Sequence, residues 1–255
     1  MPILKDKVAI VTGGGRGLGR SIAEAYRDEG AEVVITAAAN QAEIDKVAAL
    51  TGSIAMQADV TREADAARVV DAVMARFGRI DILVNNAGRG MKFVNPRFMT
   101  HPEPFWECDP AVWRMIIDTN INGVFLMTRA VVPVMLKQGS GRIINLAINF
   151  ETQKRKGFTP YGPSKAALES MTAIWAEDLR GTGVTVNAVA PGGGTETGMI
   201  PDDFPDALRK QLLQPGVIGP AAVYLASDDA AGVTGQRIVA TQFNQAPPAG
   251  NDSKG

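Results

Sequence analysis

Tyr161 and Lys165 stand four positions apart, with Pro163 between them. On a helix this spacing places both side chains on one face, and proline suits a first helical turn, where no N–H partner is needed. A free tyrosine has a pKa of about 10, and a neighbouring ammonium stabilises the phenolate and lowers that pKa. The pair therefore predicts acid–base chemistry at Tyr161, although a bare pair of this kind is more often a surface feature of an amphipathic helix.

A second set of residues suits the binding of phosphate groups. A glycine-rich loop follows an apolar run and reads Thr12-Gly13-Gly14-Gly15-Arg16-Gly17-Leu18-Gly19. Glycines between a strand and a helix bring backbone N–H groups and a helix N-terminus up to a pyrophosphate. We expect Gly13 and Gly17 to be side-chain-free because a side chain would hold the backbone off the phosphates, and Gly19 to allow close packing of the helix. The alternative is a glycine-rich turn without a ligand.

Alternating strand and helix patterns must position these residues. Leu18, Ile22 and Tyr26 recur every four positions and Gly30 ends that helix. Strands are predicted at 8–12, 33–36, 54–58, 82–85, 143–146, 185–190 and 238–240, and further helices at 41–50, 62–77, 111–138, 161–180 and 219–227. This alternation predicts an α/β fold of one domain, a Rossmann-type doubly wound parallel sheet with helices on both faces. Its ligands would lie beyond the carboxyl ends of the strands.

Composition narrows the class of protein. The chain has 255 residues, 45% of them hydrophobic and 21% charged, with a net charge of −1. That balance is typical of a globular enzyme and gives no field for nucleic acid or an anionic membrane. Cys108 is the only cysteine and the start carries no apolar leader, so we expect a cytoplasmic location. No run looks long enough to span a bilayer, and His101 stands without a ligand cluster, so no metal site is expected.

We divide the chain at residue 245. Residues 1–245 form the predicted dinucleotide-binding domain, which includes the substrate site. Residues 246–255 are small, polar and proline-rich, so they bury too little apolar area to offset their ordering entropy. They are predicted to be a flexible tail.

The motifs together resemble the short-chain dehydrogenase/reductase family from about residue 7 to residue 239. In family order and at family spacing stand the glycine loop, Asp59-Val60, Asn85-Asn86-Ala87-Gly88, Asn120, Tyr161 with Lys165, and Pro191-Gly192. The resemblance implies hydride transfer between a nicotinamide cofactor and a carbonyl, with Tyr161 as acid/base. It also implies that Lys165 binds the nicotinamide ribose and that Asn120 holds a proton-passing water.

The resemblance also implies cofactor contacts. Asp59 and Val60 would contact the adenine, and Asn86, Ala87 and Gly88 would line the central groove. Gly13, Gly15, Arg16, Gly17, Leu18, Gly19, Thr36, Ala37, Pro191 and Gly192 complete the implied cofactor site together with Tyr161 and Lys165. The segment after Gly192 is one residue longer than usual, so Thr195 and Thr197 both compete for the nicotinamide carboxamide.

The dinucleotide is predicted to be NADP(H) rather than NAD(H). NAD-dependent relatives place an acid just past the second strand, where it binds the ribose hydroxyls and repels a 2′-phosphate. Ala37 stands at that position, and Arg16 has the guanidinium geometry to bind a phosphate.

One expected catalytic group is missing. The family serine lies thirteen residues before the tyrosine, and that position holds Ile148. Asn149 could donate in its place if the strand end bends. Alternatively, Ile148 is apolar packing in a site that has lost much of its activity.

Large apolar residues between Gly88 and Asn120 suggest a lid or wall for a hydrophobic substrate; they are Met91, Phe93, Phe98, Met99, Phe105, Trp106 and Trp113. For Trp113, which opens the long helix, packing and subunit contacts are an explanation at least as good. The leading hypothesis is an NADP(H)-dependent carbonyl reductase or alcohol dehydrogenase. The alternatives are a reductase of imines or other polarised double bonds, and a weakened sensor or scaffold subunit. The resemblance suggests a homotetramer or homodimer that associates through the helices at 111–138 and 161–180.

Overall fold

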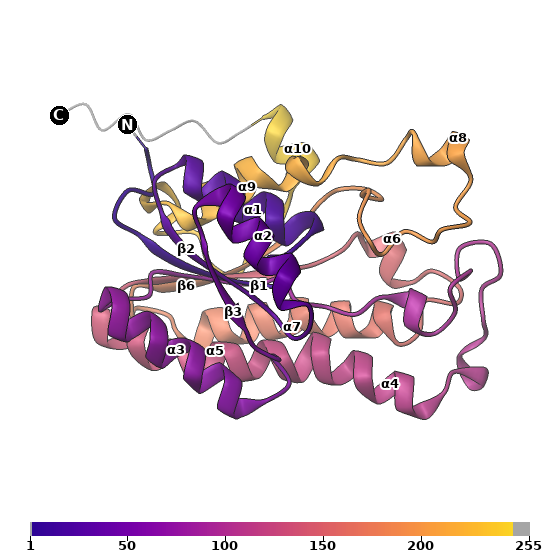
Figure 1. Cartoon of the computed structure of the whole chain (residues 1–255), viewed down its shortest axis with the longest axis horizontal. Coiled ribbons are helices and arrows are strands. Elements are labelled where there is room, and N and C mark those ends of the chain that lie inside the picture. The colour runs from indigo at the N-terminus through magenta and orange to yellow at the C-terminus, as the bar shows by residue number, and fades with distance from the viewer. Residues whose placement is uncertain (1, 247–255) are drawn as a thin grey trace.

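The computed structural model describes residues 2–246 and confirms the doubly wound fold (Figure 1). A parallel sheet has the strand order β3-β2-β1-β4-β5-β6-β7. Its strands are β1 (Val8–Thr12), β2 (Glu32–Ala37), β3 (Ile54–Gln57), β4 (Ile82–Asn85), β5 (Gly141–Leu146), β6 (Val184–Ala190) and β7 (Arg237–Val239). The order reverses between β1 and β4, which is where such sheets bind ligands.

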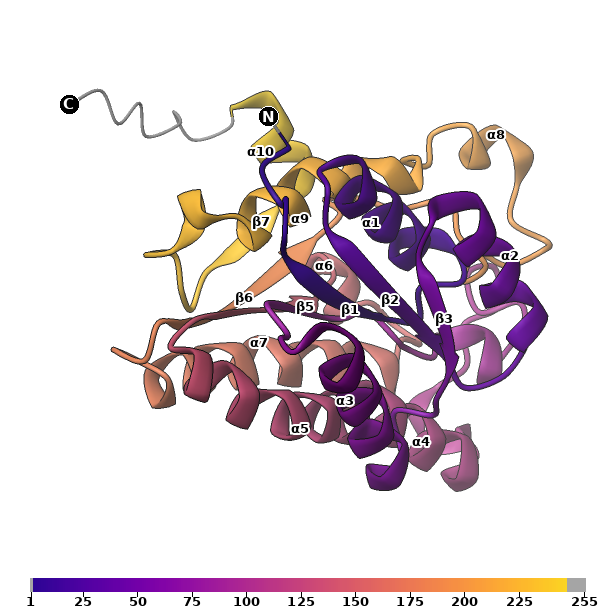
Figure 2. The same cartoon turned by 60° about the vertical axis from the view of Figure 1, so that its left-hand side comes forward.

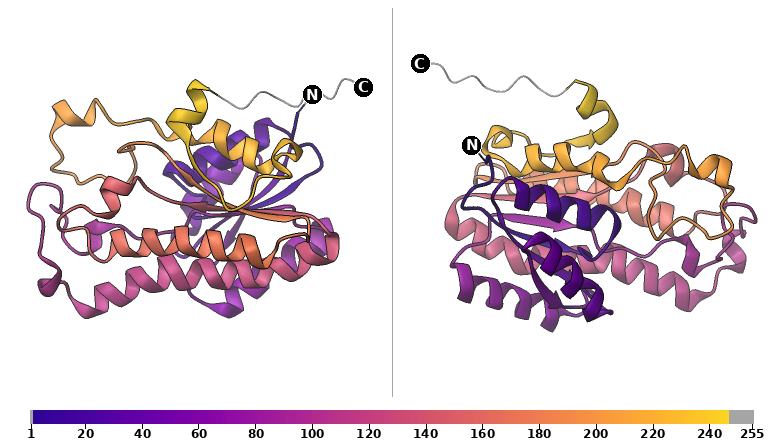
Figure 3. Two further views of the ribbon diagram at one scale, coloured as in Figure 1. Left: turned by 180° about the vertical axis from the view of Figure 1, so that it is seen from behind. Right: turned by 45° about the horizontal axis from the view of Figure 1, so that its top comes forward.

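Helices cover both faces of the sheet (Figures 1 and 2). On one face lie α1 (Gly17–Asp28), α2 (Gln41–Thr51), α9 (Gly219–Ala226) and α10 (Ala240–Gln245). On the other lie α3 (Glu63–Phe77), α5 (Gly123–Gln138) and α7 (Tyr161–Asp178). The short helices α4 (Pro110–Ile117), α6 (Phe150–Gln153) and α8 (Asp206–Arg209) lie towards one end of the molecule, as the views from behind and above also show (Figure 3).

The strand sequences explain why the sheet lies inside. All five residues of β1 and all seven of β6 are buried, as expected for apolar, β-branched runs covered on both faces. Ile22 and Tyr26 of α1 pack into the core on one face, and Met127 and Val131 of α5 into the core on the other. The packing of these two cores fixes the positions of the carboxyl ends of the strands, which the candidate site residues follow.

The predicted helix at 111–138 is divided. It consists of α4, one π-helical turn at Asp118–Asn122, and α5. Single π turns are frequent at functional sites, and this one contains Asn120, which is fully buried.

The expectation that no run is long enough to span a bilayer needs correction. Pro110–Gln138 is long and apolar enough for a membrane span by length and composition, although 44% of the tested window is buried inside the fold.

Helices α6, α8 and α10 were not predicted, because four to six residues are too few to show a helical period. Residues 247–255 of the predicted tail lie outside the described residues, and the tail stays a prediction.

Candidate functional site

The glycine loop lies at the carboxyl end of β1 and leads into α1. Gly13 has φ +65° and Gly17 has φ +53°, conformations that favour glycine. Arg16 occupies the N-cap position of α1 without a side-chain cap hydrogen bond. The first N–H groups of a twelve-residue helix therefore have no capping side chain, which suits an anion at this terminus.

The reason for two of the glycines differs from the expectation. A Cβ on Gly13 would lie 2.9 Å from the Cα of Ala87, and one on Gly19 would lie 2.3 Å from the Gly13 carbonyl oxygen. Gly13 is thus required for contact with the 85–88 turn, rather than only for approach to a phosphate. A Cβ on Gly17 would lie 3.2 Å from the Thr197 methyl carbon, so Gly17 faces the loop after β6.

Thr12 joins the glycine loop to the turn after β4, a role that sequence reasoning missed. Its buried hydroxyl accepts hydrogen bonds from the N–H groups of Asn86 and Ala87, each 3.0 Å, and donates to the Val84 carbonyl at 3.2 Å. The Asn86 amide in turn donates to the carbonyls of Thr12 and Gly13 at 2.8 and 2.9 Å. Asn86 therefore holds the loop in place with its amide group.

The adenosine side of the site carries an acid that the sequence did not reveal. Ala37 ends β2 as expected, and residues 38–40 are exposed. Glu43 of α2, however, brings its Cδ to 3.8 Å from a Cβ built on Gly15. Arg16 is exposed and lies beside Gly198, its Nε 3.8 Å from a Cβ built there. Glu43 thus lies on the β2 side of the loop, whereas Arg16 lies beside the segment that follows β6.

The remaining predicted residues of this side shape the groove. Asp59 Oδ1 accepts hydrogen bonds from the N–H and the hydroxyl of Thr61, at 3.0 and 2.8 Å. Val60 is buried and packs on Gly123, where a Cβ would lie 2.6 Å from its methyl carbon. Thr36 is buried, and its carbonyl accepts the Gly14 N–H at 3.1 Å. Leu18 packs against the core below α1.

Tyr161 begins α7 and Lys165 lies one turn later, so the predicted shared face is present. Lys165 is 4% exposed and donates from Nζ to the Leu146 carbonyl at 2.7 Å. Burial lowers its pKa to about 8. The expected lowering of the Tyr161 pKa is not found in the chain itself: burial raises it to about 12, because the phenolate would lose its solvation.

Asn120 is tied to the residues around it from two directions. Its Oδ1 accepts the Arg89 N–H at 2.8 Å, and its Nδ2 donates to the Arg89 carbonyl at 3.0 Å and to Ser164 Oγ at 2.9 Å. Ser164 is fully buried and donates to the Tyr161 carbonyl at 2.7 Å. Gly88 lies alongside, where a Cβ would stand 3.3 Å from Asn120 Oδ1. Asn120 thereby connects the turn after β4 to the first turn of α7.

The segment after β5 is anchored through its backbone. Arg237 donates to the Ile148 carbonyl at 2.8 Å and pairs with Glu169 at 2.9 Å; both side chains are 19% exposed. Ile148 and Asn149 are half-buried, and Asn149 stands at the N-cap of α6 without a side-chain cap bond. No hydrogen bond of the Asn149 amide is present within residues 2–246. This amide is therefore available as a donor.

The loop after β6 covers Tyr161. Gly192 has φ +103°, and a Cβ there would clash with Thr241, whose N–H binds the Pro191 carbonyl. Thr195 is buried and bridges to Leu213, so of the two competing threonines Thr197 is the one that faces the glycine loop. The Sδ atom of Met199 lies 3.8 Å from the Tyr161 hydroxyl. Sequence reasoning missed Met199, because a lone methionine in a loop carries no signal.

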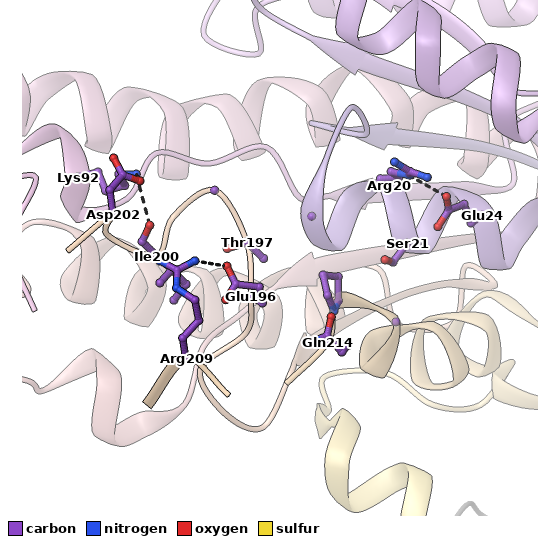
Figure 4. Close-up of a pocket in the computed structure, with 14 residues that line it drawn as sticks. Arg20, Ser21, Glu24, Lys92, Glu196, Thr197, Ile200, Asp202, Arg209 and Gln214 are labelled. Atoms are coloured by element: carbon purple, nitrogen blue, oxygen red, sulfur yellow. Dashed lines mark hydrogen bonds and ion pairs between the residues drawn. The ribbon is translucent and has the colours of Figure 1, made fainter. Parts of the chain in front are cut away.

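A cavity of about 720 Å³ lies between α1 and this loop (Figure 4). Gly17, Arg20 and Glu24 line one side, and Thr197 and Gly198 the other. Ion pairs surround it: Arg20 with Glu24, Arg209 with Glu196 and Lys92 with Asp202, at 2.8, 2.8 and 3.0 Å. The cavity thus begins at the glycine loop and has a polar, charge-balanced wall.

The predicted apolar wall is present only in part. Met91, Phe98 and Met99 pack with Phe158 against Tyr161. Phe93, Phe105 and Trp106 are 50%, 67% and 71% exposed and lie outside this cluster, and Trp113 on α4 is 39% exposed. The apolar composition of residues 89–119 suggested a wall, but composition does not show which of these side chains point into the protein and which point to solvent.

The comparison with known proteins accounts for this arrangement. A family model of short chain dehydrogenases matches residues 7–207. The chain belongs to the short-chain dehydrogenase family. A 3-oxoacyl-[acyl-carrier-protein] reductase, FabG, of Staphylococcus epidermidis is 34% identical over 245 residues, which cover 91% of this chain and 96% of that protein. Its namesake from Thermotoga maritima is 32% identical over 249 residues, or 92% of this chain and 96% of the other.

A solved structure shows the same fold for this short-chain dehydrogenase. The 3-ketoacyl-(acyl-carrier-protein) reductase from Brucella melitensis, complexed with NADH, has a TM-score of 0.82 and 31% sequence identity. The match covers 92% of this chain and 97% of the other.

Proposed function

We propose that this chain is an NADP(H)-dependent oxidoreductase that transfers hydride between the nicotinamide and the carbonyl carbon of a hydrophobic ketone or the corresponding secondary alcohol. The observation that carries this proposal is the arrangement of Tyr161, Lys165 and Asn120 on the carboxyl side of the sheet, which also carries the glycine loop. A protein that only binds a dinucleotide does not need a buried lysine and a tyrosine on one helical face.

The dinucleotide would lie along this side of the sheet. The N-terminus of α1 and the Gly13–Gly17 backbone would hold the pyrophosphate, Thr36, Ala37, Asp59 and Val60 would surround the adenosine, and Gly88, Gly192 and Thr197 the nicotinamide half. When bound, the cofactor supplies or accepts the hydride.

The protein's own part in the reaction is the proton. In reduction the carbonyl carbon gains the hydride and the oxygen gains a proton from the Tyr161 hydroxyl. Because burial raises the Tyr161 pKa to about 12, this hydroxyl is protonated at neutral pH and can donate its proton in reduction. Lys165, with a pKa of about 8, carries its charge at neutral pH and can stabilise the phenolate left behind.

Asn120 acts as a positioning residue. It holds Arg89 and Ser164, and Ser164 holds the backbone of Tyr161. Ile148 cannot give the substrate oxygen the hydrogen bond that a serine at this position would supply, and the Asn149 amide replaces that bond only in part. The alternative substrate is an imine or another polarised double bond, for which the apolar Ile148 is no loss. A sensor or scaffold without turnover is the remaining alternative.

The relatives support a ketone substrate, since two of them are named as 3-oxoacyl reductases. The absence of an acid at Ala37 supports NADP(H). Glu43 beside Gly15 opposes a 2′-phosphate, and the Brucella melitensis relative was solved with NADH. The preference for NADP(H) therefore depends on Arg16 reaching the phosphate, and a comparison of the affinities for NADPH and NADH tests it.

We further propose that the chain self-associates as a homodimer or homotetramer. Phe125 and Leu136 on α5 and Ile174 on α7 are 47%, 44% and 56% exposed, and apolar exposure of this kind on neighbouring helices marks an interface. The cytoplasmic location stays a prediction from the sequence.

The test is turnover. Purified protein with NADPH or NADH is offered medium-chain ketones and, in parallel, cyclic imines, and cofactor oxidation is followed at saturating cofactor. Ketone-dependent oxidation that is faster with NADPH supports the proposal. Oxidation with imines alone favours the alternative substrate, and cofactor binding without any turnover favours the sensor.

A further inference from the structure

Three consecutive cations, Lys154, Arg155 and Lys156, lie just after α6, in the segment that joins β5 to α7. All three side chains are exposed. Among the ion pairs of residues 2–246, none includes any of the three. Their charge is therefore not neutralised by a carboxylate within ion-pairing distance.

Arg155 lines a second cavity, of about 380 Å³, whose other lining residues are apolar except for Thr100 and Gln211. The opposite wall comes from α8 and the residues on either side of it, and includes Phe204, Leu208 and Leu212; Met99 and Gly194 lie between. Leu208 is 47% exposed, so part of this apolar wall is open to solvent. The cavity thus combines an apolar body with one cationic edge.

This cavity shares the lining residue Met99 with the apolar cluster that packs on Tyr161. Met99 lines the cavity and also packs in the cluster of Phe98 and Phe158 against Tyr161. The Arg155 guanidinium lies over the Phe158 ring, 5.1 Å from its centre. The Phe158 ring therefore contacts the Arg155 guanidinium and belongs to the apolar cluster that packs on Tyr161, the proposed proton donor.

We infer that the substrate of this site is an amphipathic carbonyl compound: its carbonyl lies at Tyr161, its apolar chain fills the second cavity, and an anionic end pairs with Arg155. This inference rests on the proposed function and names its substrate class. A guanidinium binds carboxylate and phosphate oxygens in bidentate geometry, and Lys154 and Lys156 add to the attraction.

Three carboxylates, Asp202, Asp203 and Asp206, lie close in sequence to the apolar wall of this cavity. Asp202 already pairs with Lys92 at 3.0 Å, and Asp203 accepts the Thr100 hydroxyl at 2.8 Å. Asp206 lies in the first turn of α8, where a carboxylate is favourable. If Arg155 instead pairs with Asp206 and so joins its own segment to α8, the loss of either charge must change kcat/KM for neutral and for charged substrates equally.

The first experiment compares charged and neutral substrates of equal length. Methyl ketones ending in a carboxylate (5-oxohexanoate, 8-oxononanoate and 10-oxoundecanoate) are assayed beside their methyl esters, with saturating NADPH. We expect wild type to prefer at least one acid over its ester in kcat/KM. Arg155→Gln should lower kcat/KM for that acid about tenfold, the worth of one charge-assisted hydrogen bond, and leave the ester unchanged.

Three variants serve as controls. Arg155→Lys keeps a charge and should retain part of the preference. Arg76→Gln removes an exposed arginine in the last turn of α3, which leads to the amino end of β4, and should change nothing. Asp206→Asn should leave the preference for the acid intact. If Arg155→Gln and Asp206→Asn slow acid and ester equally, Arg155 belongs to a loop contact and the inference is wrong.

The second experiment does not need turnover. Binding of octanoate and of octanamide to the protein–NADPH complex is measured by calorimetry, in wild type and in Arg155→Gln. Tighter binding of octanoate by wild type, lost in the variant, supports the inference even if no ketone is reduced. Equal binding of the two ligands overturns it. Reduction of neutral ketones without any preference for acids overturns it as well, while the proposed function survives.

Discussion

Replacing Lys165 by methionine should stabilise the fold while it abolishes turnover. Lys165 is 4% exposed, and burial lowers its pKa from 10.5 to about 8. The native state therefore holds a charge in surroundings that disfavour it, as functional sites commonly do. Methionine has a similar length and no charge, so it removes this cost without leaving a large void.

The size of the effect follows from the pKa. A lowering from 10.5 to about 8 is about 2.5 units, and at 1.36 kcal/mol per unit the charged form destabilises the native state by about 3 kcal/mol. Loss of the hydrogen bond to the Leu146 carbonyl costs about 1 kcal/mol. The net gain for Lys165→Met at pH 7 is about 2 kcal/mol, or a Tm higher by about 4–8 °C.

The pH dependence has a defined sign. Below pH 8 Lys165 is charged in both states, and the native state bears the full cost. As the pH rises from about 8 to 10.5 the native state loses its proton while the unfolded chain keeps it, so wild type gains stability there. The advantage of Lys165→Met should therefore be constant below pH 8 and shrink over this window.

The assay is urea unfolding of both proteins at several pH values between 6.5 and 10, with Lys46→Met on the exposed face of α2 as the matched control. A variant that is less stable than wild type at pH 7, or whose difference from wild type does not change with pH, refutes the buried charge at Lys165.

Four other outcomes are expected. NADPH should bind more tightly than NADH, and Arg16→Ala should reduce this difference in affinity. Ala37→Asp should shift the preference towards NADH and Glu43→Gln towards NADPH. Titrations that show tighter binding of NADH to wild type would count against the preference for NADPH. Ile148→Ser should raise kcat on simple ketones about tenfold or more, since a lost donor to a developing oxyanion typically costs about 10²–10³; an unchanged rate, with no loss in Asn149→Ala either, contradicts the need for a second donor. Light scattering should give several times 27.0 kDa, and a monomer would refute the proposed association. The rate of reduction should fall as the pH rises above about 8, where Lys165 loses its charge, and a flat profile to pH 10 would argue against its role.

The sheet and its order of elements could be predicted because each strand is short, apolar and bounded by polar residues. The bounds of β1 and β4 agree with the predicted 8–12 and 82–85, and the other strands differ by one or two residues at either end. The periodicity of apolar residues does not predict an element that is irregular or shorter than one repeat. The π turn at Asp118–Asn122 interrupts a continuous apolar period, and α8 has only four residues.

The candidate site was predictable where residue type alone carries the chemistry, as for Tyr161 and Lys165. It was not predictable where the role arises from contact between distant segments. The Met199 sulfur beside the Tyr161 hydroxyl and the Glu43 carboxylate beside Gly15 depend on how loops fold back, and neither lies in a motif. The pKa of Tyr161 shows the same limit, since its burial outweighs a cation four residues away in the sequence.

The central claim is that this chain transfers hydride to a carbonyl carbon and that Tyr161 supplies the proton. The most direct measurement uses NADPH deuterated at the transferred position, a ketone found in the substrate screen, and mass spectrometry of the alcohol formed by wild type and by Tyr161→Phe. Wild type should place one deuterium on the carbinol carbon, and Tyr161→Phe should bind NADPH normally but form at least about a hundredfold less alcohol. An alcohol without deuterium, or an unimpaired Tyr161→Phe variant, would contradict the account.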